Sequence, residues 1–225
     1  MAKLSKLGGM LFTQISSGIY RGKKLALPAF SSTRSTKSIV KGSFFDTWRA
    51  ELRGAAFIEC FGGSGAMALE ALSNGAKNVY AIEKDAAAHK IMRKNFELFG
   101  LGANAILGDC FERLPEILHD LQANMNGCSA ANSSESHTVN SSENSVSDPA
   151  RRVFVYLDPP FAIRQGFGGI YERVLALIAR LGSVQCEPLI AIEHMSELEL
   201  PPKIGDFALL KSRKFGATTM SYYAR

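Results

Sequence analysis

Residues 55–72 read AAFIECFGGSGAMALEAL, and this stretch decides the fold. Its beginning is an apolar run typical of a buried strand, and its end shows the periodicity of a helix. The glycines between them let the backbone approach a ligand closely, and free N–H groups at a helix start attract an anionic or electron-rich group. We therefore expect a ligand-binding loop made of Phe61, Gly62, Gly63, Ser64 and Gly65.

Two acidic residues follow the next two predicted strands. Residues 78–82 predict a strand, and Glu83 comes directly after it, where a carboxylate can accept both hydroxyls of a ribose. Residues 103–107 predict a short strand that leads through a glycine to Asp109. Asp109 can accept a hydrogen bond from an adenine amino group, and it can also cap the helix predicted over residues 110–121.

The glycine loop alone leaves the cofactor open. Residues 63–68 also fit the G-x-G-x-x-A dinucleotide fingerprint, so a nicotinamide cofactor and S-adenosylmethionine are both compatible with it.

Asp158-Pro159-Pro160-Phe161 follows the apolar run of residues 153–157, which places it at the end of another buried strand. Two consecutive prolines make a rigid loop without backbone N–H groups, so the loop offers acceptors, namely the Asp158 carboxylate and the Pro159 carbonyl. The Phe161 ring offers a flat apolar face beside them. A planar amine can donate to these acceptors while its ring stacks on the aromatic, which predicts Asp158, Pro159 and Phe161 as catalytic and Pro160 as substrate-binding. The alternative is that the loop simply ends a strand.

The glycine loop, the ribose acid, the Gly-Asp pair and the Asp-Pro-Pro-Phe loop, in that order, resemble class I S-adenosylmethionine-dependent methyltransferases that modify exocyclic amino groups. From about Ile15 to the end, the chain is similar to the bacterial 16S ribosomal RNA guanine-N2 methyltransferase family (RsmD-like, of the guanine-966 type). It departs from the usual family pattern at residues 33–36 and 41–42, at Glu59 and at Gly63. The segments that carry the resemblance are GIYRGKKL (18–25), FGGSGA (61–66), LEALSNGA (69–76), LDPPF (157–161) and KFGATT (214–219).

The resemblance implies a Rossmann-like α/β fold. The sheet would be mostly parallel and seven-stranded, with helices on both faces and an antiparallel C-terminal hairpin over residues 207–215 and 218–223. An N-terminal hairpin over residues 12–28 and a helix over residues 36–52 would precede it. The resemblance also implies that S-adenosylmethionine binds at the glycine loop, Glu83 and Asp109, that no metal is needed, and that Asp158 and the Pro159 carbonyl accept hydrogen bonds from a guanine N2 amine.

Charge is distributed unevenly along the chain. Residues 1–54, 55–200 and 201–225 carry +8, −7 and +4, which gives the net charge of +5. Basic ends suit a nucleic-acid enzyme, because neutralising phosphates releases counterions. The alternative is a solvated basic surface. The residues predicted to contact RNA are Arg21, Lys23, Lys24, Arg34 and Lys41.

Composition indicates a globular protein of 225 residues with one catalytic domain, residues 55–225, behind a basic extension, residues 1–54. Residues 122–150 are rich in serine and asparagine and predict a flexible insertion. Hydrophobic content is 46%, with no long apolar run and no C-x-x-C pair, which argues against a membrane protein, a disulfide framework and a zinc site. We expect a cytoplasmic monomer that acts on 16S rRNA, the small ribosomal subunit or an assembly intermediate.

Two other functions stay open. The same cofactor and loop would serve methylation of DNA adenine N6 or of a protein glutamine amide. An NAD-dependent oxidoreductase would account for residues 63–68 and Glu83, but it leaves the Asp-Pro-Pro-Phe loop without a role.

Overall fold

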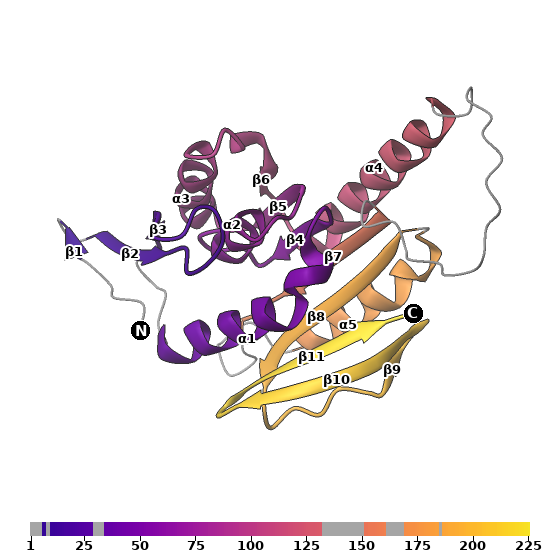
Figure 1. Ribbon diagram of the computed structural model, residues 1–225. Helices are drawn as coiled ribbons and strands as arrows, with labels where there is room; N and C mark the ends of the chain where they lie inside the picture. Colours follow the sequence, from indigo (N-terminus) through magenta and orange to yellow (C-terminus); the bar gives the residue numbers. More distant parts are fainter. Residues whose placement is uncertain (1–5, 8–9, 29–33, 132–150, 161–168, 185) are drawn as a thin grey trace.

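The computed structural model describes residues 6–7, 10–28, 34–131, 151–160, 169–184 and 186–225 (Figure 1). Within these residues an eight-stranded sheet has the order β6-β5-β4-β7-β8-β11-β10-β9, and a small antiparallel sheet has the order β1-β2-β3. The strands of the large sheet are β4 (Ala56–Cys60), β5 (Asn78–Glu83), β6 (Ala105–Leu107), β7 (Arg152–Leu157), β8 (Glu187–Met195), β9 (Lys203–Ile204), β10 (Phe207–Phe215) and β11 (Thr218–Ala224). The strands of the small sheet are β1 (Lys6–Leu7), β2 (Met10–Gln14) and β3 (Lys24–Leu27).

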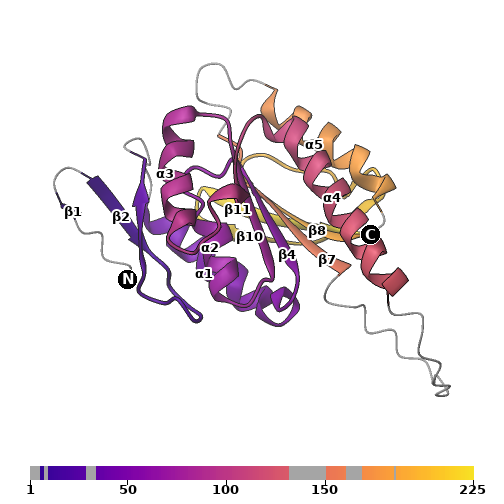
Figure 2. The ribbon, with the colours of Figure 1, turned by 90° about the horizontal axis from the view of Figure 1, so that it is seen from above.

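Helices cover both faces of the large sheet, as Figure 2 shows from above. The helices are α1 (Arg34–Leu52), α2 (Ala66–Ser73), α3 (Ala86–Glu97), α4 (Cys110–Ala131) and α5 (Ile170–Arg180). One core lies between the sheet and α1, α2 and α3, and a second lies between the sheet and α4 and α5. Strand β4 serves both cores, because successive side chains of a strand point to opposite faces: Phe57 packs in the first core, and Ile58 and Cys60 pack in the second.

Strands β6, β5, β4, β7 and β8 run parallel, so their carboxyl ends lie at one edge of the sheet, here called the catalytic edge. The chain leaves β4 towards β5 and β6 and later returns to β7 on the other side of β4. Ligands of open α/β sheets bind at such a switch in strand order, outside the carboxyl ends. The sequence prediction of a mostly parallel Rossmann-like sheet is confirmed.

The C-terminal hairpin is confirmed, and it continues the sheet on the β8 side. Thr218 on β11 pairs with Met195 at the end of β8, and Phe215 on β10 pairs with Thr218. The turn between β10 and β11 therefore lies at the catalytic edge. The prediction of seven strands was one too few, because β9 is a two-residue strand that pairs only with Phe207 and Ala208.

The predicted end of the helix at Leu121 was wrong. Helix α4 continues to Ala131, so the first part of the Ser- and Asn-rich stretch is helical. A preformed helix adds residues easily, because only the first turn is costly to form. Residues 132–150, the rest of the predicted insertion, lie outside the described residues.

The N-terminal hairpin and helix are confirmed as elements. Strands β2 and β3 pair antiparallel, and α1 begins at Arg34. Phe44 and Phe45 are buried, and Trp48 packs against the same core. The Phe44 ring meets the Phe57 ring edge-on at 5.8 Å between centroids. The apolar stripe of α1 is therefore core packing, as the sequence predicted.

Candidate functional site

The loop after β4 forms a turn that only small residues can make. The Gly62 N–H donates to the Ile82 carbonyl at 2.8 Å, and the Gly65 N–H donates to the Gly62 carbonyl at 2.7 Å. Gly65 has φ +73°, and a Cβ there would stand 2.4 Å from the Phe96 ring. Gly63, with φ +54°, has no atom within 4 Å of its Cβ position, so the loop is open on that side. Ser64, between the two, is buried.

Glu83 is fixed beneath the glycine loop. One carboxylate oxygen accepts the Gly63 N–H at 2.8 Å, and the other accepts the Asp85 N–H at 2.7 Å. A carboxylate oxygen can accept a second hydrogen bond, so each oxygen keeps capacity for one hydroxyl of a ribose. The predicted cofactor residues Gly63 and Glu83 are thus brought together by a direct bond.

Asp109 lies at the next position along the edge, directly before α4. Its Oδ1 accepts the Phe111 N–H at 3.1 Å, which is the capping role foreseen from the sequence. Its Oδ2 receives Lys84 Nζ at 2.9 Å and lies 3.7 Å from Arg173. Partial burial raises the pKa of Asp109, but the bonds from Lys84 and Phe111 and the nearby positive charges outweigh it and leave the pKa lowered. Asp109 is therefore an anionic acceptor at this edge.

Phe111 is a site residue that the sequence did not single out. Its ring meets the Phe61 ring edge-on, with 6.0 Å between centroids, and Arg173 lies over it at 3.9 Å. Phe61 itself has φ +59°, an uncommon conformation for a residue other than glycine. The two rings form an apolar wall between the glycine loop and Asp109.

The Asp-Pro-Pro loop stands directly beside the glycine loop. Cys60 pairs with Leu157, so the segments that begin at Phe61 and Asp158 leave adjacent strands at the same level. Pro159 is buried, while Asp158 and Pro160 are half-buried. Phe161 lies outside the described residues.

Two buried carboxylates lie beneath this crevice, and the sequence analysis gave them no role. Glu59 accepts the Ala68 N–H at 2.9 Å and so holds the first turn of α2. Glu193 accepts the Tyr156 hydroxyl at 2.7 Å. Burial, and then the charges of Glu193 and Asp158, raise the pKa of Tyr156 well above its usual value, so the phenol stays a donor. A glutamate within an otherwise apolar strand is the sequence signal that could have identified Glu59 and Glu193.

The basic residues of the N-terminal bend lie away from the catalytic edge. Helix α2 starts at that edge and runs about 12 Å to Ser73, given 1.5 Å per residue. The Ile19 N–H donates to the Ser73 carbonyl, and Lys23 lies over the Phe99 ring beyond the end of α3. The bend thus packs at the amino-terminal edge of the sheet, with the exposed Arg21, Lys23 and Lys24.

Lys41 and Arg34 lie on α1 and not in the N-terminal bend. Lys41 Nζ lies 2.7 Å from the buried Glu70 carboxylate, and the Lys41 side chain is 14% exposed. Its charge is therefore used within the protein. Arg34 is the first residue of α1. Arg213 of β10 bonds Ser43 and Thr47 of α1, so α1 begins on the catalytic side of the sheet.

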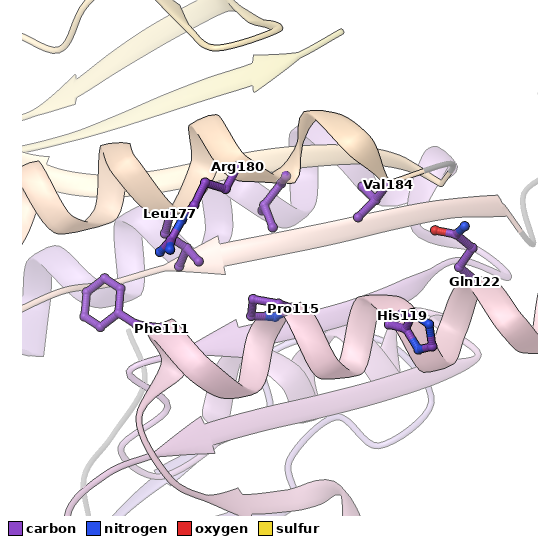
Figure 3. Close-up of a pocket in the computed structure, with 8 residues that line it drawn as sticks. Phe111, Pro115, His119, Gln122, Leu177, Arg180 and Val184 are labelled. Carbon is purple, nitrogen blue, oxygen red and sulfur yellow. The ribbon is translucent and has the colours of Figure 1, made fainter.

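A groove with a volume of about 450 Å³ lies between α4 and α5 (Figure 3). Apart from Phe111 near one end, its walls come from turns of α4 and α5 and from the short 3-10 turn after α5, away from the carboxyl ends of the strands. The site defined by Gly63, Glu83, Asp109 and Asp158 is outside this groove. The groove is lined by Phe111, Pro115, His119, Gln122, Leu177, Arg180, Leu181 and Val184.

The residues that the structure describes contain neither a metal-binding cluster nor a membrane-spanning helix. No cluster of three or more His, Cys, Asp or Glu side chains could hold a metal ion there. None of the helices described is both long and apolar enough to span a membrane.

A glycine loop at the sheet's switch point, with Glu83 at the end of the neighbouring strand and the Asp-Pro-Pro loop on the other side, is the arrangement of a class I methyltransferase. The chain matches the family described as "Conserved hypothetical protein 95" over residues 13–120 and 109–224, and it belongs to that family. The membership of an rRNA methyltransferase family, predicted from the sequence, is confirmed, and the chain is a methyltransferase.

Relatives and solved structures agree with this class. "Ribosomal RNA small subunit methyltransferase D" of Escherichia coli (strain K12) is 26% identical over 213 residues, 94% of this chain and 89% of the relative. The solved structure of the Escherichia coli protein yhhF is 23% identical, covers 95% of this chain and 98% of its own, and has a TM-score of 0.65. The T. thermophilus 16S rRNA N2 G1207 methyltransferase (RsmC), solved with AdoMet and guanosine, is 16% identical, covers 100% of this chain and 50% of its own, and has a TM-score of 0.57.

Proposed function

We propose that this protein transfers a methyl group from S-adenosylmethionine to the exocyclic N2 amine of a guanine in 16S ribosomal RNA, in the cytoplasm. The observation that carries the proposal is the pairing of Cys60 with Leu157, which puts the acceptor loop next to the glycine loop. The small-subunit rRNA methyltransferase that the chain matches along 94% of its length supports an RNA substrate.

The cofactor fits the residues at the edge. Glu83 keeps an acceptor position on each oxygen for the two ribose hydroxyls, and the Gly63 side of the loop is open for close approach. Phe61 and Phe111 offer an apolar wall for the adenine, with the Asp109 carboxylate at its end. The sulfonium of the bound cofactor supplies an electrophilic methyl group.

The acceptor loop supplies the chemistry on the nucleobase side. The N2 lone pair of guanine is delocalised into the ring, so the amine is a poor nucleophile. Hydrogen bonds from the amine protons to Asp158 and the Pro159 carbonyl localise that pair and stabilise the positive charge that develops. The rigid prolines fix these acceptors in advance, and positioning of this kind contributes much of the rate.

The buried groups under the loop support this role of Asp158. Tyr156 is two residues before Asp158 and is held by Glu193, so the strand end is pinned by a buried hydrogen bond. We propose Phe161 and Pro160 as the surface on which the base lies. The target nucleotide must be flipped out or unpaired, because a stacked and paired base does not expose its N2 edge.

The RNA contacts proposed from the sequence divide into two groups. Arg34 is the first residue of α1, at the end of this helix that is nearest the catalytic edge, and we propose that it contacts RNA. Arg21, Lys23 and Lys24 lie at the opposite edge, where only a large RNA could reach them together with the crevice. Lys41 is committed to Glu70, and we propose that it holds the extension in place rather than binding RNA.

The proposal is tested by methyl transfer from labelled S-adenosylmethionine to small-subunit rRNA, with mass spectrometry to find N2-methylguanosine. Asp158→Asn should lower turnover by about 100-fold or more, since it weakens an acceptor aligned with the transition state. Affinity for S-adenosylhomocysteine, measured by calorimetry, should stay near wild type. Asp120→Asn, an exposed site on α4, is the matched control.

Three outcomes would contradict the proposal. An Asp158→Asn variant with wild-type turnover would show that the loop is structural. Methylation of DNA adenine or of a protein glutamine in place of guanine would move the enzyme to another substrate class. Binding of NAD without any binding of S-adenosylhomocysteine would end the methyltransferase assignment of the cofactor site.

A further inference from the structure

We propose that three basic residues of β10, Lys211, Arg213 and Lys214, form a docking strip for the phosphates of the RNA that flanks the target guanine. The inference rests on the proposed function. It places part of the RNA-binding surface outside the N-terminal extension. These three residues are called the β10 strip below.

The sheet register places the β10 strip beside the crevice. Arg213 pairs with Met220, which pairs with Glu193, one residue beyond the level of Leu157. Three strand spacings of about 4.8 Å separate β10 from β7, so Arg213 stands about 14 Å to the side of the acceptor loop. Strand β8 continues to Met195, about 10 Å past that level, so the hairpin rises beside the crevice. An RNA whose base enters the crevice must pass this hairpin or the opposite wall.

The three charges of the strip are not neutralised. Among the residues that the structure describes, none of the three has a carboxylate within 4 Å. Lys211 lies over the Trp48 ring at 4.4 Å, and Lys214 is exposed. Burial, and then the charge of the neighbouring Arg213, lower the pKa of Lys211, and the charge of Glu51 opposes them in part.

Arg213 is also oriented in advance. Its Nη1 donates to Ser43 Oγ and to Thr47 Oγ1, both at 3.1 Å, so the guanidinium is fixed against α1. Both bonds use one nitrogen, and the N–H groups of Nη2 and Nε remain for a partner. A guanidinium edge with two parallel donors matches two phosphate oxygens.

A different explanation exists for basic residues on β10. Strand β9 covers only its beginning, so the rest of β10 is an edge strand, and lysines on edges prevent pairing with other chains. That role would make the charge matter for association between copies and leave RNA affinity unchanged. The two explanations therefore predict different measurements.

The test uses the full chain with Arg213→Gln and Lys214→Gln together. The control, Lys77→Gln with Lys203→Gln, also removes two positive charges, but from exposed positions at the amino-terminal edge. Arg213→Lys with Lys214→Arg keeps the charge of the strip. The readouts are the dissociation constant for purified 16S rRNA across a salt series, KM and kcat for methylation, affinity for S-adenosylhomocysteine, and mass by light scattering.

Loss of two phosphate contacts should reduce the slope of log K against log salt by about 1.4 to 1.8. At about 0.1 M salt this is a loss of affinity of about 25- to 60-fold. KM for RNA should rise in the same proportion, with kcat at saturating RNA and cofactor affinity unchanged. The control should stay near wild type. The charge-keeping variant should keep the wild-type salt slope, because the number of charges is unchanged, while it loses the part of the affinity that depends on the bidentate guanidinium of Arg213.

The failures can be told apart. If wild-type protein neither binds nor methylates RNA, the proposed function fails. If wild type methylates RNA and the β10 variant matches the control, only the docking strip is refuted. A variant that self-associates while its RNA affinity and salt slope stay at wild-type values would assign the strip to protection of the edge.

Discussion

Glu70→Ala should detach the N-terminal extension and destabilise the protein by about 3–5 kcal/mol, the range for removing one partner of a buried ion pair. The Glu70 side chain on α2 is fully buried. Its carboxylate accepts the N–H and hydroxyl groups of Ser16 and Ser17 at 2.7 to 2.9 Å. Lys41 Nζ completes the shell at 2.7 Å.

The magnitude follows from what each group loses. A hydrogen bond to a charged group contributes about 1.5–3 kcal/mol, but the contributions at Glu70 cannot simply be summed, because bonds in one network are not additive. The removal takes the carboxylate partner from Lys41, which keeps its 3.3 Å bond to the Gln14 carbonyl. It also leaves the N–H groups of Ser16 and Ser17 without this acceptor. Lys41 is 14% exposed and can turn towards water, which favours the lower end of the range.

Urea unfolding followed by circular dichroism measures the effect. A double-mutant cycle of Glu70→Ala with Lys41→Ala should give a coupling energy of about 0.5–3 kcal/mol. Glu112→Ala, an exposed carboxylate in the first turn of α4, is the control and should stay near wild type. A cost of Glu70→Ala below about 1 kcal/mol, or no coupling to Lys41, would refute the reasoning.

Three further predictions concern the cofactor site and the response to acid. Glu83→Ala should weaken S-adenosylhomocysteine binding by about 1–3 kcal/mol in calorimetry, with an unchanged circular dichroism spectrum; wild-type affinity would remove Glu83 from the site. Gly65→Ala should impair folding or cofactor binding, because a Cβ would meet Phe96 at 2.4 Å; normal stability together with normal binding would show that the loop can shift. Burial raises the pKa of Glu70, but Lys41 and Ser16 outweigh it and leave the pKa below its ordinary 4.5. The stabilisation by Glu70 should therefore be complete above that value and decline as the pH falls below it, so wild type and Glu70→Ala should converge in acid; a constant difference would contradict this.

Much of the fold could be predicted because its signals are local. The apolar runs that end at Cys60 and Leu157, and the glycines after the first of them, mark strands and a turn wherever they occur. The order of motifs then placed the crevice, since carboxyl ends of parallel strands share one edge. The short strand β9 could not be seen in this way, because two residues carry no periodicity.

Contacts between distant segments were beyond the sequence. Lys41 was predicted to bind RNA because it lies in a basic stretch, and that role stays a prediction. Its ion pair with Glu70, 29 residues away on another helix, could not be foreseen from the sequence. The bend was expected to present Arg21 to the substrate. That contact stays a prediction. The position of the bend depends on Gly18, whose backbone approaches Ser73 so closely that a Cβ would lie 1.8 Å from the Ser73 carbonyl oxygen. A charge pattern shows which residues are basic and does not show where they face.

The direction of α4 has a practical consequence. The helix starts at Cys110 near the crevice and, at 1.5 Å per residue, extends about 33 Å to Ala131, well past the opposite end of the sheet (Figure 1). The carboxyl end of α4 thus lies on the side of the molecule opposite the catalytic edge. A fluorescent label or a fused reporter could be placed there to follow the enzyme on its substrate without obstructing entry of the nucleobase.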